Sequence, residues 1–117
     1  PEAWALAASH RIGVSPLFDR PNYRASLPTK IDEYRAVGLI AITSDLPGSL
    51  PAIEGSAAAA SFTAGDADAL AAELRSAVDD SRRLAAATTE TADVRRRRAW
   101  DGERFLDFYE RLVTASR

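Results

Sequence analysis

The sequence lacks cysteine and methionine entirely, and it has one histidine among its 117 residues. The absence of cysteine excludes disulfide bonds, thiolate metal sites and a cysteine nucleophile. His10 alone cannot build a site of several histidines, so we expect no metal and place His10 at the surface or at a helix cap. Because a complete translated chain begins with methionine, we expect this sequence to be a fragment or a processed product.

Long hydrophobic runs and a strong charge of one sign are also missing. No apolar run approaches the ~20 residues of a membrane span, and no signal peptide is visible, which favours the cytoplasm. The net charge of −2 gives no reason to expect nucleic acid as a partner. Four consecutive arginines, 95–98, would point around a helix rather than form one patch, so we interpret them as a solvated helix end.

The apolar pattern alternates between helices and short strands, which predicts an α/β fold with a parallel sheet covered by helices. We expect Trp4, Leu6 and Ala7 or Ala8 to face inward. In order, the expected elements are a helix at 1–9, a strand at 11–15, a loop at 17–25, a helix at 28–37, a strand at 39–43 and a helical turn at 49–54 capped by Ser49. The composition of 57–62 allows a strand or a helix, and the turn signals on either side favour a strand. The remaining elements are a helix after the N-cap Asp66, a helix at 81–98 and an amphipathic helix at 101–116.

Three further details follow from the same pattern. A stripe of Leu84, Ala87, Thr91 and Val94 is expected to face inward on the helix at 81–98. The apolar side chains between Phe105 and Val113 are expected to be core. Three strands make half of a doubly wound sheet, so residues 1–117 are interpreted as a single partial domain whose missing strands would precede Pro1.

The most informative stretch is 27–38, LPTKIDEYRAVG. Pro28 suits the first turn of a helix, Ser26 is an N-cap candidate, and Gly38 would end the helix in a left-handed conformation. A helix that begins after a strand and a loop offers free N–H groups and a positive dipole end, which favour phosphate. Arg35 would need an exposed or a paired position.

This stretch resembles the donor-binding motif of the group 1 (family 4) glycosyltransferases, which have two Rossmann-like domains in the GT-B arrangement. The resemblance runs over nearly all of the chain but covers only the later part of the C-terminal, nucleotide-sugar-binding domain. It implies a three-layer Rossmann-like sheet and a retaining enzyme of the hexosyltransferase type. The expected partners are a nucleoside diphosphate sugar donor, an acceptor sugar, lipid or other hydroxyl compound, and the missing N-terminal part of the enzyme.

The resemblance also assigns roles to residues of this sequence. Glu33 would accept hydrogen bonds from the ribose hydroxyls, a task that suits a carboxylate with two oxygens. Backbone N–H groups in the segment Ser26, Leu27, Thr29 and Lys30 would hold the diphosphate, with the Thr29 hydroxyl and the Lys30 ammonium as further candidates. No cofactor or metal is implied beyond the donor substrate, and the whole enzyme would be cytoplasmic, with peripheral association at the inner face of the membrane allowed.

Two departures from the family pattern leave alternatives open. The family usually has a second glutamate where this chain has Ala25, and a proline where it has Ile40, so the catalytic residue stays unknown. The main basic residues that bind the diphosphate precede this segment in the family, so we expect the fragment alone to be inactive. A non-catalytic Rossmann-like partner or regulatory module, and an unrelated binding domain with an accidental motif, remain as alternatives.

Overall fold

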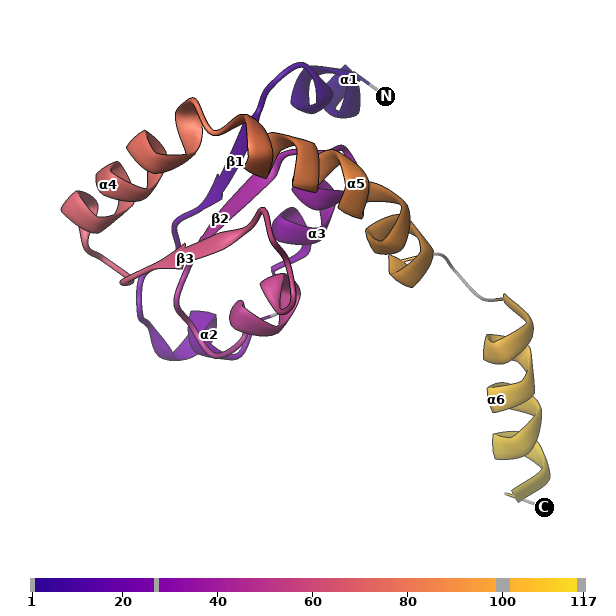
Figure 1. The fold of residues 1–117 in the computed structure, drawn as a ribbon. Helices are drawn as coiled ribbons and strands as arrows, with labels where there is room; N and C mark the ends of the chain where they lie inside the picture. The colour runs from indigo at the N-terminus through magenta and orange to yellow at the C-terminus, as the bar shows by residue number, and fades with distance from the viewer. Residues whose placement is uncertain (1, 27, 99–101, 116–117) are drawn as a thin grey trace.

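A computed structural model describes residues 2–26, 28–98 and 102–115 (Figure 1). The strands are β1 (Ile12–Ser15), β2 (Ile40–Ser44) and β3 (Ala60–Phe62). The helices are α1 (Glu2–Ala8), α2 (Pro21–Arg24), α3 (Thr29–Ala36), α4 (Ala67–Val78), α5 (Ser81–Arg98) and α6 (Gly102–Ala115), with a 3-10 turn, η1 (Leu50–Ile53).

The three strands form one parallel sheet, as the alternating pattern predicts, and the structure shows that their order is β1-β2-β3. Ile12 pairs with Ile40 and Ile42 with Ala60, and every residue of the central strand β2 is buried. Because α3 lies between two parallel strands in the chain, it begins at their carboxyl ends and finishes at their amino ends. Figure 1 also shows α1, which precedes β1 in the chain, at the amino end of that strand, and α2, which follows β1, at its carboxyl end.

Helices pack on the sheet through alternate side chains of the strands. Ile40 and Ile42 belong to a buried cluster with Ala77 of α4 and Ala87 of α5. On β1, Gly13 lies beneath the ring of Tyr34 from α3, so close that an ideal Cβ on Gly13 would be 2.3 Å from Tyr34 Cγ. The hydroxyl of Tyr34 donates to the carbonyl of Val14 at 3.4 Å, and this contact fixes α3 against β1.

The second half of α5 is tied to α3 by part-buried polar contacts. Arg35 is only 6% exposed, and its Nη1 donates to the Ala52 carbonyl oxygen at 2.5 Å while its Nη2 lies 3.4 Å from Oε2 of Glu90. Nε of Arg95 donates to the carbonyl of Ala36 at 2.8 Å. The expectation that Arg35 is exposed or paired is confirmed, because Glu90 supplies its counterion.

Most predicted element boundaries are confirmed to within one to three residues. Asp66 caps α4 by accepting from the N–H of Ala69, and Gly38 ends the α3 segment with φ at 84°. The predicted inward stripe of α5 is confirmed, since Ala87 and Val94 are buried and its other two members are half-buried. His10 is exposed, and its Nδ1 lies 2.8 Å from the Leu6 carbonyl oxygen at the end of α1.

Several local expectations are wrong. The segment expected to be a loop at 17–25 contains the single turn α2, in which Pro21 occupies a first-turn position that needs no N–H donor. The N-cap of α3 is Pro28 rather than Ser26, whose own N–H instead closes the preceding turn by donating to the Tyr23 carbonyl. Ser49 precedes η1 as expected, but its side chain makes no capping hydrogen bond.

The two terminal helices differ most from expectation. No residue of α1 is buried, and its Trp4 and Leu6 are 44% and 65% exposed. α6 is a helix as expected, but its apolar side chains are not core: they are half exposed or more in Leu106, Phe108, Tyr109, Leu112 and Val113. Phe105 of the same face lies outside the described side chains. Figure 1 shows α6 standing apart from the sheet.

Candidate functional site

The start of α3 is the predicted phosphate site, and it lies at the carboxyl end of the sheet. The N–H groups of Thr29 and Lys30 donate to no acceptor in the part of the chain that the structure describes, as is usual in a first helical turn. Pro28 contributes no N–H, and its position adds no side-chain cap. Leu27 lies outside the described residues. Among the described residues, two adjacent amide donors are therefore without an acceptor at the positive end of the helix dipole.

The loop after β2 braces the segment that leads into α3. The N–H of Gly48 donates to the Arg24 carbonyl at 2.7 Å. An ideal Cβ at Gly48 would lie 2.6 Å from the Ser26 carbonyl oxygen and 2.9 Å from the Ala25 carbonyl carbon. The glycine is thus required by close approach of two backbones, which sets the position of Ser26 before the helix. The turn at Pro47 and Gly48 therefore serves packing.

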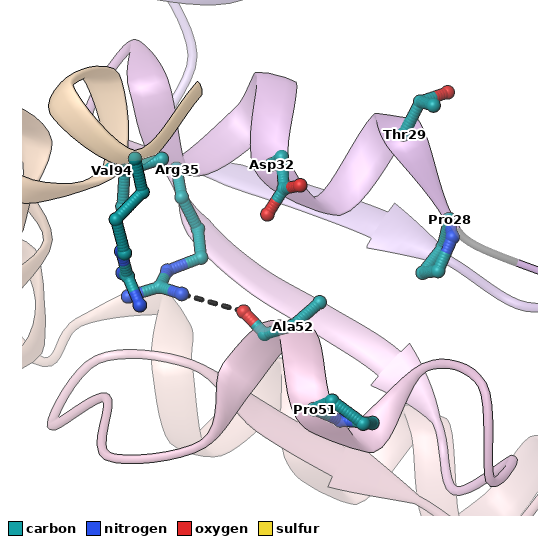
Figure 2. Close-up of a pocket in the computed structure, with 8 residues that line it drawn as sticks. Pro28, Thr29, Asp32, Arg35, Pro51, Ala52 and Val94 are labelled. Atoms are coloured by element: carbon teal, nitrogen blue, oxygen red, sulfur yellow. Dashed lines mark hydrogen bonds between the residues drawn. The ribbon is translucent and has the colours of Figure 1, made fainter. Parts of the chain in front are cut away.

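A hollow of about 440 Å³ opens on one side of α3, between its start, η1 and the end of α5 (Figure 2). Thr29, Asp32 and Arg35 line it from α3, and Arg97 lines it from α5. Figure 2 shows the Arg35 guanidinium reaching Ala52 of η1. Since this cation already donates to Ala52 and pairs with Glu90, Arg35 has little uncompensated charge to offer an incoming anion.

Glu90 is the acidic centre of this contact. Burial would raise the pKa of its carboxyl, but hydrogen bonds from the Ser56 hydroxyl at 2.7 Å and the Ala57 N–H at 2.8 Å, together with Arg35, outweigh burial and hold the pKa below its ordinary value of 4.5. The carboxylate is therefore committed to joining α5, α3 and the loop after η1. We infer that Glu90 and its partners stabilise the fold and do not bind a ligand.

A second, smaller hollow of about 250 Å³ lies on the opposite side of α3, toward α1. Its lining residues are Ala3, Trp4, Ala7, Lys30, Glu33 and Tyr34. Glu33 is half-buried, yet no ion pair or side-chain hydrogen bond engages its carboxylate among the described residues, and Lys30 is likewise unpaired. A half-buried carboxylate without a protein partner retains its full capacity to accept O–H donors.

The structure divides the predicted site residues between two sides of one helix. Lys30 and Glu33 line the hollow toward α1, whereas Thr29 lines the hollow toward η1. Ser26 is half-buried in the braced loop. Trp4 was missed as a site candidate, because only the tertiary approach of α1 to α3 brings it to Glu33 and no spacing in the sequence signals this.

Other site classes find no support in the described residues. No group of three or more histidine, aspartate or glutamate side chains there is arranged to hold a metal ion. None of the helices in the described ranges has the length and apolar character that crossing a membrane requires. Searches against protein-family models, curated proteins and solved structures find no match to this chain.

Proposed function

We propose that this chain forms part of the nucleotide-sugar-binding domain of a retaining GT-B glycosyltransferase and binds the nucleoside diphosphate of the donor. The diphosphate lies at the start of α3, where the N–H groups of Thr29 and Lys30 and the Lys30 ammonium meet it. The ribose lies beside Glu33, whose carboxylate accepts from its two hydroxyls. These positions follow from the roles that the motif at 27–38 implies and from where α3 places its residues.

The observation that carries the proposal is the half-buried carboxylate of Glu33, which has no partner among the described residues and lies one turn after the start of α3. Lys30 and Glu33 are about 4.5 Å apart along the helix axis at 1.5 Å per residue, which suits adjacent phosphate and ribose groups. The parallel sheet supports the proposed position of the diphosphate, because the start of α3 lies at the carboxyl ends of the strands, where open α/β sheets bind ligands.

The chemistry that this chain contributes is binding and charge stabilisation. Amide N–H groups and a lysine at a helix start stabilise the negative charge that develops on a leaving diphosphate. The proposal assigns no residue of this chain to the acceptor hydroxyl, so the role proposed for the chain is to bind the donor. A glutamate is not present at position 25, where the family usually contacts the donor sugar.

A non-catalytic partner or regulatory module is the second candidate. The exposed apolar face of α6 favours it, since a patch of large apolar side chains commonly marks a contact with another protein. This candidate predicts that the purified protein binds no nucleoside diphosphate.

The test is titration of UDP, GDP and ADP into the purified protein by calorimetry, followed by Glu33→Ala. We expect the loss of hydrogen bonds to a charged group to weaken binding by about tenfold or more. Asp32→Ala is the matched control, because Asp32 neighbours Glu33 but lines the other hollow, and its binding should equal that of wild type. Absence of nucleotide binding, or equal losses in both variants, contradicts the proposal.

A further inference from the structure

The indole of Trp4 lines a hollow together with the Glu33 carboxylate, which has no partner among the described residues. Trp4 is the largest apolar side chain of α1, and it is 44% exposed. It lines the same hollow as Glu33 and Lys30. An aromatic surface, an acceptor and a cation therefore converge on one space, which is the composition of a site for a polar ligand with a flat ring.

The opposite wall of this hollow is fixed. Tyr34 is held by its contact with Gly13 and by the hydrogen bond from its hydroxyl to the Val14 carbonyl at 3.4 Å. Its hydroxyl is thus already engaged, so the groups left for a ligand are the Glu33 carboxylate, the Lys30 ammonium and the indole face. The sequence order along α3 places the cation nearer the helix start and the carboxylate one turn further in.

We propose that Trp4 is the stacking platform for the nucleobase of the bound nucleoside diphosphate, an inference that rests on the proposed function. With phosphate at the start of α3 and ribose hydroxyls on Glu33, the base attached to that ribose extends toward α1, where the indole lies. Stacking on an aromatic ring tolerates any base, because every base has a π-face. The site therefore binds UDP, GDP and ADP with similar affinity at this contact.

The experiment compares Trp4→Ala and Trp4→Phe with wild type, using UDP and inorganic pyrophosphate as probes in calorimetric titrations. Loss of stacking should weaken UDP binding by about tenfold in Trp4→Ala, while Trp4→Phe keeps most of the affinity. Pyrophosphate has no base, so its affinity should be unchanged in both variants. Leu6→Ala is the control, because Leu6 is an exposed apolar residue of the same helix outside the hollow.

The outcomes separate this inference from the proposed function. If Glu33→Ala loses UDP while Trp4→Ala binds it as wild type does, the donor site stands and the stacking role is overturned. If Trp4→Ala weakens UDP and pyrophosphate equally, or Leu6→Ala weakens UDP as much, Trp4 acts through the position of α1 and the stacking role is also overturned. A wild-type protein that binds neither probe overturns both.

Discussion

Tyr34 packs its ring directly onto the backbone of Gly13, and this contact decides how α3 sits on the sheet. Cγ of the Tyr34 ring occupies the space that the Cβ of any other residue at position 13 would need. Since Glu33 precedes Tyr34 in α3, the same contact fixes the direction in which the candidate ribose-binding carboxylate points.

Gly13→Ala should therefore destabilise the protein. The new Cβ would overlap Cγ of Tyr34, so either α3 must shift or the Tyr34 side chain must leave its rotamer. Such a rearrangement lowers the free energy of unfolding by about 1–3 kcal/mol. Urea denaturation measures the change in the free energy of unfolding. In a Tyr34→Ala background the same substitution should cost much less, and equal costs in both backgrounds would show that the ring contact is not the cause.

Glu90→Gln should destabilise the protein at neutral pH. The change leaves the buried Arg35 without its counterion, and the loss of a partner from a buried pair costs about 3 kcal/mol. Asp93→Asn on the same helix is the control, because the Asp93–Arg96 pair is well exposed and such pairs contribute about 0–1 kcal/mol.

The pH dependence of the Glu90 effect has a defined sign. The pKa of Glu90 is lowered in the folded protein, so its contribution to stability is fully present above its ordinary value of 4.5 and is lost as the pH falls through the lowered pKa. The gap in unfolding free energy between wild type and Glu90→Gln should be constant above about pH 5.5 and shrink in more acidic buffer. A gap that is unchanged down to pH 3 contradicts this assignment.

Gly48→Ala tests the brace before α3. An added methyl group would collide with the carbonyl of Ser26, and the two backbones must separate at a cost of about 1–3 kcal/mol. Because Ser26 leads into the helix start, we also expect weaker pyrophosphate binding. Thermal unfolding and calorimetry measure the two effects, and an unchanged midpoint would mean that the loop yields without strain.

Local chemistry made several elements of this fold predictable. Asp66 is a side-chain acceptor before an apolar helical stripe, Gly38 tolerates positive φ, and Pro16 follows β1 directly. Each of these residues acts on its own backbone, so the sequence alone is sufficient to locate the helix and strand ends. The turn α2 was missed because Pro21 is compatible with both a loop and a helical first turn.

Long-range partners were not predictable in the same way. The sequence indicates that Arg35 needs a partner, but Glu90 is 55 residues away and only the packing of α5 on α3 brings it there. Periodicity likewise identifies an apolar face on α6 without indicating what covers it. The meeting of Trp4 with Glu33 depends on how α1 approaches α3, which no spacing in the sequence encodes.

The all-parallel arrangement of the sheet has a kinetic consequence. Thr43 and its strand partner Ser15 are 28 residues apart, and no hairpin joins any two neighbouring strands of this sheet. Loop closure must therefore precede every strand pairing, and chains dominated by such distant contacts fold more slowly than helical bundles of similar size. Isolated helices form in about a microsecond, so we expect the pairing of the strands, and not helix formation, to limit the refolding rate.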